Sequence, residues 1–241
     1  MKPSVHLATT REYSFADNQQ LALELAASIA QRLAAAVRER GHALIALSGG
    51  SSPKAMFAHL SRAAIPWHAV TITQVDERWV APDHGDSNAR LIREHLLINA
   101  AAAANFLLLK NSAPTPEAGA AECDAMLRAL PLPFDVIVLG MGDDGHTASF
   151  FPGAEELSVV LDDSRTALCA ALHPPNAAQA RMTLTLRALL SARCLILQIS
   201  GDAKLQALRA ARQPGLIEEM PVRAVLRQTA VQLEVWCSLN S

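Results

Sequence analysis

Short apolar segments alternate with amphipathic segments of helical period along most of this 241-residue chain. Apolar residues recur every four positions from Leu21 to Val37, which predicts a long helix that ends at Gly41. Strands are predicted in the apolar runs, at residues 43–47, 70–75, 106–109, 134–139, 167–172, 194–200 and 231–236. Further helices are predicted from Pro53, with Ser52 as its N-cap, and at residues 87–97, 117–130, 203–212 and 222–227.

Strand–helix alternation at this spacing is typical of a mostly parallel sheet with helices on both faces. We therefore predict an α/β fold, doubly wound and Rossmann-like. Neither a Gly/Ser linker nor a repeat divides the sequence, which favours a single domain over residues 1–241. Apolar residues make up 51% of the chain, so a sizeable core is available to such a domain.

The composition also narrows the expected partners and compartment. A formal charge of −2 gives no general attraction for nucleic acid or for an anionic membrane, so neither is expected as a partner. The cysteines Cys123, Cys169, Cys194 and Cys237 are widely spaced in apolar stretches, which is typical of buried thiols in a reducing compartment. The sequence has no signal-peptide pattern and no apolar run approaching ~20 residues. We expect a cytoplasmic protein.

Polar, glycine-containing or charged turns follow three of the predicted strands, at residues 48–52, 76–78 and 140–146. Parallel strands place their carboxyl ends at one edge of the sheet, where open α/β sheets bind their ligands. The three turns are therefore expected to meet in one site.

The first turn has the composition of an anion-binding loop. It consists of Ser48, Gly49, Gly50, Ser51 and Ser52. Glycines let the backbone approach an anion, and a following helix directs free N–H groups at it. The loop fits neither the Walker A nor the dinucleotide pattern, and an ordinary strand–helix turn remains the alternative. Arg181, before the amphipathic segment 182–185, and Lys204, after another strand, are candidate cations for a phosphate.

The third turn contains a candidate general base, His146, which we expect near the start of a helix. Asp144 lies two residues earlier and can orient the imidazole. The alternatives are a structural histidine in a tight glycine turn and a metal site, although one histidine with scattered carboxylates falls short of zinc-ligand spacing. Asp76 and Arg78 in the second turn add a carboxylate and a cation to the same edge. A salt-bridged surface turn is the usual role of such a run, but its place beside the candidate anion-binding loop favours a substrate site.

Taken together, the three turns resemble those of the 6-phosphogluconolactonases. The resemblance rests on residues 47–53, residues 75–80 with His84, Ser87 and Asn88, and residues 140–153, with supporting segments at 181–185 and 200–204. Two features depart from the family pattern. Residues 174–180 look longer and richer in alanine, and Phe150 stands where leucine is commoner.

The resemblance implies a fold shared with glucosamine-6-phosphate deaminases and a hydrolysis of 6-phosphogluconolactone in the pentose phosphate pathway, without metal or other cofactor. His146 would then activate water, Arg78 would stabilise negative charge, and Asp144 or Asp76 would orient the base or a substrate hydroxyl. The loop 48–52, Arg181 and Lys204 would hold the phosphate. We expect a monomer or a weak homodimer.

Two alternatives remain at this stage. The first is a glucosamine-6-phosphate deaminase, although residues 147–153 lack the carboxylate that follows the histidine in those enzymes. The second is a non-catalytic sugar-phosphate sensor on the same fold.

Overall fold

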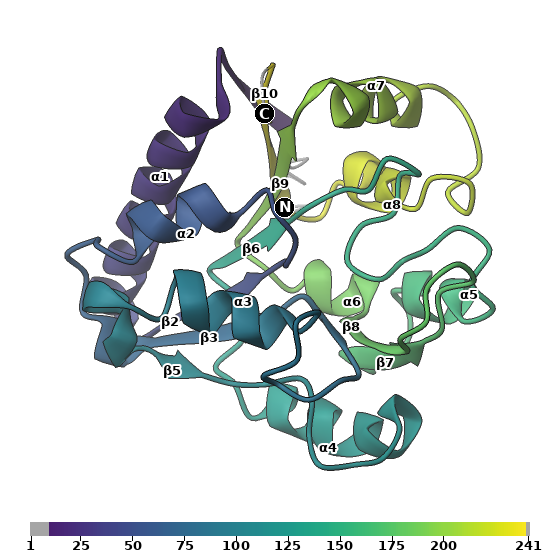
Figure 1. Cartoon of the computed structure of the whole chain (residues 1–241), viewed down its shortest axis with the longest axis horizontal. Helices are drawn as coiled ribbons and strands as arrows, with labels where there is room; N and C mark the ends of the chain where they lie inside the picture. The colour runs from purple at the N-terminus through teal and green to yellow at the C-terminus, as the bar shows by residue number, and fades with distance from the viewer. Residues whose placement is uncertain (1–9, 240–241) are drawn as a thin grey trace, which may run out of the picture.

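The computed structural model describes residues 10–239 and is built around a parallel sheet of seven strands (Figure 1). The strands lie in the order β1-β10-β9-β6-β2-β3-β5, and every neighbouring pair is parallel. Their bounds are β1 Thr10–Phe15, β2 Ala43–Leu47, β3 Val70–Gln74, β5 Asn105–Phe106, β6 Val136–Leu139, β9 Cys194–Ser200 and β10 Gln232–Ser238. The prediction of a mostly parallel sheet is confirmed.

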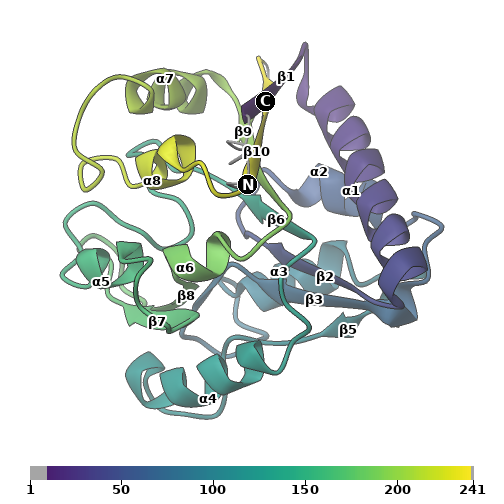
Figure 2. The ribbon, with the colours of Figure 1, turned by 180° about the vertical axis from the view of Figure 1, so that it is seen from behind.

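Helices lie on both faces of this sheet, which makes the fold doubly wound (Figures 1 and 2). The α-helices are α1 Asn18–Arg40, α2 Lys54–Leu60, α3 Asn88–His95, α4 Pro116–Arg128, α5 Leu157–Leu161, α6 Leu186–Leu189, α7 Asp202–Ala211 and α8 Val222–Arg227. Short 3-10 helices occur at Trp67–Ala69 and Asn99–Ala103. None of the helices in the described part of the chain is long and apolar enough to cross a membrane.

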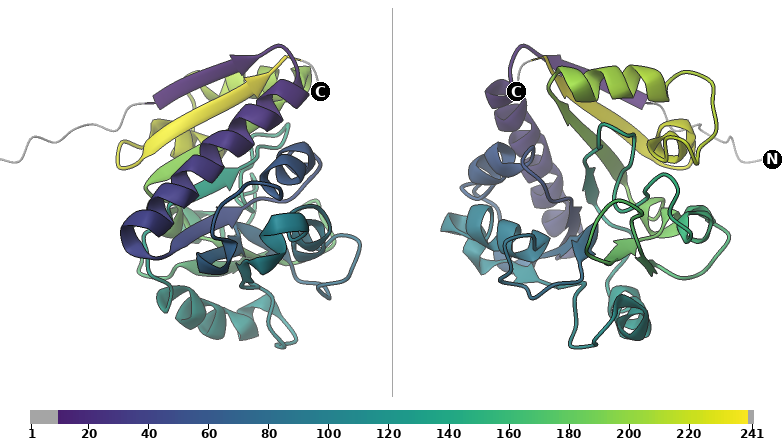
Figure 3. Two further views of the ribbon diagram at one scale, coloured as in Figure 1. Left: turned by 90° about the vertical axis from the view of Figure 1, so that its left-hand side faces the viewer. Right: turned by 45° about the vertical axis from the view of Figure 1, so that its right-hand side comes forward.

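The apolar residues form one core on each side of the sheet, and Figure 3 shows the helices on the two sides. Strand β2 shows why, because its side chains alternate between the faces. Ile45 and Leu47 pack with α1 and α2, whereas Leu44 and Ala46 pack with the core that includes α7 and α8. Burial on both faces explains why β2 reads as a continuous apolar run.

A second sheet of three antiparallel strands, which the sequence did not predict, lies beside the first. It contains β4 Asp76–Arg78, β8 Arg181–Leu184 and β7 Cys169–Leu172, in the order β4-β8-β7. The charged run 76–78 is therefore a short strand rather than a turn, and Arg78 pairs with Arg181 across the sheet. Backbone pairing with β8 compensates for the low strand propensity of three charged residues, so tertiary context overrides local preference.

Several other boundaries differ from the predictions. Strand β1 was missed, although Tyr13 and Phe15 alternate there and stack on Trp236 with ring centroids 4.3 and 5.5 Å away. The strand predicted at 106–109 is only two residues long, at Asn105–Phe106. Gly41 ends α1 in the left-handed conformation, with φ of 78°, as predicted. Ser52 does not cap α2, because α2 begins at Lys54 after Pro53 and has no side-chain cap.

Candidate active site

A cleft opens at the carboxyl ends of β2 and β6, where the strand order reverses direction (Figure 1). From β2 the chain runs outward through β3 and β5, and from β6 it runs the other way through β9 and β10. Such a switch point is where open α/β sheets bind ligands. The cleft has a volume of about 190 Å³.

The cleft brings together all but one of the residues that the sequence singled out. The residues that were predicted from the sequence and that line the cleft are Ser48, Gly49, Gly50, Ser51, Ser52, Asp76, Arg78, His146, Arg181 and Lys204. Asp144 lies behind His146 and lines a neighbouring pocket instead. The three turns therefore meet at one edge, as predicted.

The loop 48–52 forms one wall of the cleft and is held in place by long-range contacts. Lys204 Nζ donates to Ser52 Oγ at 3.3 Å, and Gln198 Nε2 donates to the Ser52 carbonyl at 3.1 Å. Gly140 N–H donates to Ser48 Oγ at 3.3 Å, which joins this loop to the turn after β6. Gly50 has φ of 93°, a conformation that favours glycine. The Ser52 hydroxyl thus accepts a hydrogen bond from the Lys204 ammonium group.

Arg181 supplies a buried positive charge to the same cleft. The residue is 7% exposed, and within residues 10–239 its Nε and Nη1 atoms have no hydrogen-bond partner. Buried donors are costly when unpaired, so these two nitrogens call for an acceptor from outside the chain. Burial lowers the pKa of the Arg181 guanidinium, and the nearby charge of Arg78 lowers it further. An anionic ligand would relieve both effects. We name Arg181, Lys204 and the loop 48–52 the anion cradle.

His146 and Asp144 form a hydrogen-bonded pair at the other wall. Asp144 Oδ1 lies 2.6 Å from His146 Nδ1 and also accepts the His146 main-chain N–H at 3.0 Å. Burial opposes ionisation of Asp144, but the hydrogen bonds from His146 outweigh it and hold the pKa of Asp144 below its ordinary value. Because a carboxylate can only accept, Nδ1 carries the proton and Nε2 is left as the basic nitrogen.

The surroundings of this pair fix the imidazole in place. The ring of Phe151 stacks on His146, with centroids 4.3 Å apart. Gly142 leaves room on another side, since a Cβ there would lie 2.2 Å from His146 Nδ1. The expected helix start after His146 is wrong, because residues 147–156 form turns and the next helix is α5. Ala148, with φ of 51°, reverses the chain there instead.

Asp76 does not contact His146 and has a different set of partners. Its Oδ2 accepts from Ser149 Oγ at 2.5 Å, and its Oδ1 accepts from Asn88 Nδ2 at 3.2 Å. Of the two carboxylates proposed to orient the base, Asp144 is therefore the one placed to do so. Asp76 is 8% exposed and presents its carboxylate at the cleft wall.

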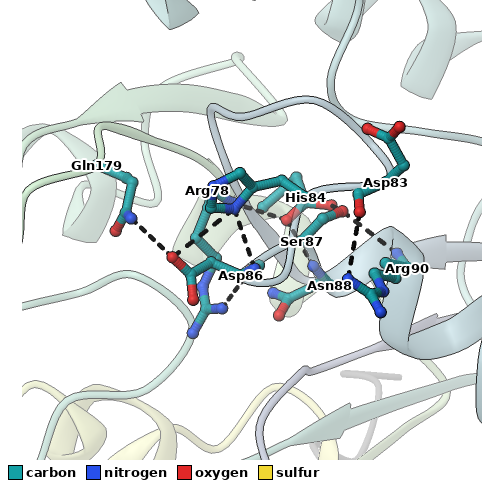
Figure 4. Close-up of polar contacts among 9 residues, drawn as sticks. Arg78, Asp83, His84, Asp86, Ser87, Asn88, Arg90 and Gln179 are labelled. Atoms are coloured by element: carbon teal, nitrogen blue, oxygen red, sulfur yellow. Dashed lines mark hydrogen bonds and ion pairs between the residues drawn. The ribbon is translucent and has the colours of Figure 1, made fainter.

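Arg78 is held by the loop between β4 and α3 (Figure 4). Its Nη1 donates to the main-chain carbonyl of Asp86 at 2.5 Å. Asp86 is itself tied on two sides, since its N–H donates to His84 Nδ1 at 3.1 Å and its Oδ2 accepts from Gln179 Nε2 at 2.9 Å. The segment 174–180 therefore reaches the site through Gln179, by bracing the loop that holds Arg78.

Sequence reasoning missed several residues of the cleft. Asn88, Gln198 and Phe151 all line it. Asn88 belongs to a matched family segment, but an asparagine at a helix start carries no chemical signal of its own. In the part of the chain that the structure describes, no group of three or more His, Cys, Asp or Glu side chains is placed to hold a metal ion.

The fold and the cleft define a doubly wound α/β protein with a cleft at its switch point that is lined by arginine and lysine side chains. Comparison with known proteins agrees. The family model described as glucosamine-6-phosphate isomerases/6-phosphogluconolactonase matches residues 16–236. A 6-phosphogluconolactonase of Mesorhizobium japonicum is 45% identical over 223 residues, covering 92% of this chain and 93% of that protein. The chain belongs to the glucosamine-6-phosphate isomerase/6-phosphogluconolactonase family.

Solved structures support the same assignment. A crystal structure of a 6-phosphogluconolactonase from Shewanella baltica has a TM-score of 0.93 at 44% identity, covering 95% of this chain and 98% of that one. A monomeric glucosamine-6-phosphate deaminase has a TM-score of 0.76 at 17% identity, covering 93% and 96% of the two chains. The second likeness shows the shared fold alone.

Proposed function

We propose that this protein hydrolyses 6-phospho-D-glucono-1,5-lactone to 6-phospho-D-gluconate in the oxidative branch of the pentose phosphate pathway. The observation that carries the proposal is the pairing of His146 with Asp144 across one cleft from the anion cradle. A phosphorylated lactone carries a dianion at one end and an electrophilic carbonyl at the other. The two walls of the cleft match these two ends.

The anion cradle binds the 6-phosphate in this account. Lys204 and Arg181 supply two positive charges, and Arg181 has two buried donor nitrogens without partners in the described chain. The loop 48–52 adds hydroxyls and backbone N–H groups before α2. Charge-assisted hydrogen bonds of this kind are worth ~1.5–3 kcal/mol each, so the phosphate contributes most of the binding.

His146 acts as the general base on water. Nε2 takes a proton as the water oxygen bonds to C1 of the lactone, and the carbonyl oxygen gains negative charge that Arg78 stabilises. The bond between C1 and the ring oxygen then breaks. His146 returns the proton to that oxygen, and the new carboxylic acid ionises in water. Asp144 stabilises the imidazolium that forms between the two steps, as its lowered pKa allows.

Asp76 orients a substrate hydroxyl from the cleft wall in this account. The reaction needs no cofactor, because a lactone carbonyl is reactive enough for a positioned base and cations to suffice. We propose that a monomer or a weak homodimer is active.

The test is a direct assay with freshly prepared 6-phosphogluconolactone, corrected for spontaneous hydrolysis in the same buffer. We expect rapid turnover that survives exhaustive chelation, and a kcat/KM at least about tenfold lower on unphosphorylated gluconolactone. Glucosamine 6-phosphate should release no ammonia, since residues 147–153 contain no carboxylate. Equal rates on the two lactones, or deamination of the amino sugar, would overturn the proposal.

A further inference from the structure

Asn88, the first residue of α3, lies buried between the anion cradle and Asp76. It is 2% exposed. Its Nδ2 donates to the Asp76 carbonyl at 2.8 Å and to Asp76 Oδ1 at 3.2 Å. On its other side the amide lies against Gly49, where a Cβ would come within 1.8 Å of Asn88 Oδ1. One side chain therefore sets how closely the loop 48–52 approaches strand β4.

Glu77 fixes Asn88 from behind. Side chains alternate along β4, so Asp76 and Arg78 line the cleft while Glu77 points away from it and is 1% exposed. Glu77 Oε1 accepts the N–H groups of Arg78 and Asn88, both at 2.8 Å. Its Oε2 accepts from Ala89 N–H at 2.8 Å, and also from Ser87 Oγ and Gln74 Nε2.

Both oxygens of the Glu77 carboxylate thus accept two or more hydrogen bonds beside the N-terminus of α3. Burial raises the pKa of Glu77, and the hydrogen bonds from Asn88, Ala89, Arg78 and Ser87 limit that rise. The result is a rigid connection between β4 and α3 that holds the Asn88 backbone in a single position.

Asp76 continues the connection to the opposite wall. Its Oδ2 accepts from Ser149 Oγ at 2.5 Å, and Ser149 is fully buried in the segment that follows His146. Contacts therefore run from Gly49 through Asn88 and Asp76 to Ser149. They join the wall that holds the anion to the wall that holds the base.

We propose that Asn88 is a positioning residue, anchored by Glu77, that sets the separation between the anion cradle and His146 and so matches the cleft to the length of its substrate. The inference rests on the proposed function. Asn88 acts through Asp76 and Gly49, and it takes no part in proton transfer. Misplacing reacting groups by about 1 Å costs ~10²-fold in rate, so a loose connection lowers kcat more than it weakens phosphate binding.

The test is Asn88→Asp, which keeps the size of the side chain and replaces the Nδ2 donor by an oxygen. Two carboxylates then face each other across about 3.2 Å, and such a pair holds one proton between them at low pH. That proton restores one of the two hydrogen bonds that Nδ2 makes to Asp76, and its loss drives the pair apart. We expect the kcat of the variant, relative to wild type, to rise as the pH is lowered from 8 to 6.

The other charged groups near the pair are present in both proteins, so the ratio cancels their titration. Those that line the cleft are Arg78, His146, Arg181 and Lys204, and Glu77 lies behind. Asn111→Asp is the matched control. Asn111 is half-buried, its Nδ2 donates to the Gly119 carbonyl at 3.0 Å, and it does not line the cleft. Its kcat ratio to wild type should not change with pH.

Asn88→Ala is a second variant that removes the connection without adding charge. It should lower kcat about equally at both pH values, with a smaller change in KM. The inference would be overturned if Asn88→Ala kept the wild-type kcat, or if the ratio of kcat in a folded Asn88→Asp to wild-type kcat did not change with pH. Either result would leave the proposed function intact. Failure of the wild-type protein to hydrolyse the lactone would instead refute the proposed function, and the inference with it.

Discussion

The substitution Gly142→Ala tests how far activity depends on the position of the His146–Asp144 pair. The φ angle of Gly142 is not in the left-handed region, so its backbone accepts alanine. The added Cβ would lie 2.2 Å from both Nδ1 and Cε1 of His146 and 2.7 Å from Asp144 Oδ1. Ordinary contact begins near 3.4 Å, so the imidazole must move by about 1.2 Å (3.4 − 2.2).

The size of the effect follows from that displacement. A shift of about 1 Å in a catalytic group lowers the rate ~10²-fold, equivalent to ~2.7 kcal/mol in the barrier. The fold should survive, because His146 borders the open cleft and can swing away. We therefore expect kcat to fall about 100-fold while the thermal midpoint stays within a few degrees of wild type.

Steady-state kinetics and a thermal melt on the same preparation measure both quantities. Gly85→Ala is the control, since a Cβ there meets nothing within 4 Å and its backbone also accepts alanine. It should retain wild-type turnover. If Gly142→Ala keeps more than about a third of wild-type kcat, the geometry of the pair does not limit the reaction, and the role given to His146 is wrong.

Three further substitutions probe the surroundings of the site. In Glu77→Gln, at least two hydrogen-bond donors face the amide NH₂ whichever way the amide is turned. Urea unfolding should therefore show a free energy of unfolding lower by on the order of 2–6 kcal/mol. A decrease below about 1 kcal/mol would contradict the role of Glu77 as a buried anchor. The hydrogen bond to Glu156 raises the pKa of His173. The pair therefore stabilises the fold fully below pH ~6.5, and this stabilisation is lost as the pH rises through the raised pKa. The melting-temperature deficit of His173→Asn should therefore shrink from pH 6 to pH 8.5, and a constant deficit would refute this. Lys204→Ala should raise KM for the phosphorylated lactone about tenfold and weaken inhibition by inorganic phosphate to match, whereas an unchanged KM would remove Lys204 from the anion cradle.

The parallel sheet and the meeting of the three turns could be predicted because both follow from local patterns. The buried strands read as continuous apolar runs, and parallel strands must place their carboxyl ends at one edge. The contact between Asp144 and His146 was also predictable, since two residues of separation within a glycine-rich turn bring a carboxylate to an imidazole.

The errors arose where distant parts of the chain determine local structure. Strand β4 is three charged residues long, too short for periodicity to reveal, and it depends on pairing with β8 about a hundred residues later. The Ser52 hydroxyl accepts from Lys204, 152 residues away, instead of capping its own helix. The helix expected after His146 is replaced by the reversal at Ala148.

The most direct test of the central claim is the kinetics of His146→Ala on 6-phosphogluconolactone. The imidazole is the only group to which the account assigns proton transfer, and a positioned base contributes ~10²–10⁴-fold. Because the anion cradle remains, we predict a fall of that size in kcat with KM within about threefold of wild type. Near-normal turnover by the variant, above the spontaneous rate in the same buffer, would contradict the account.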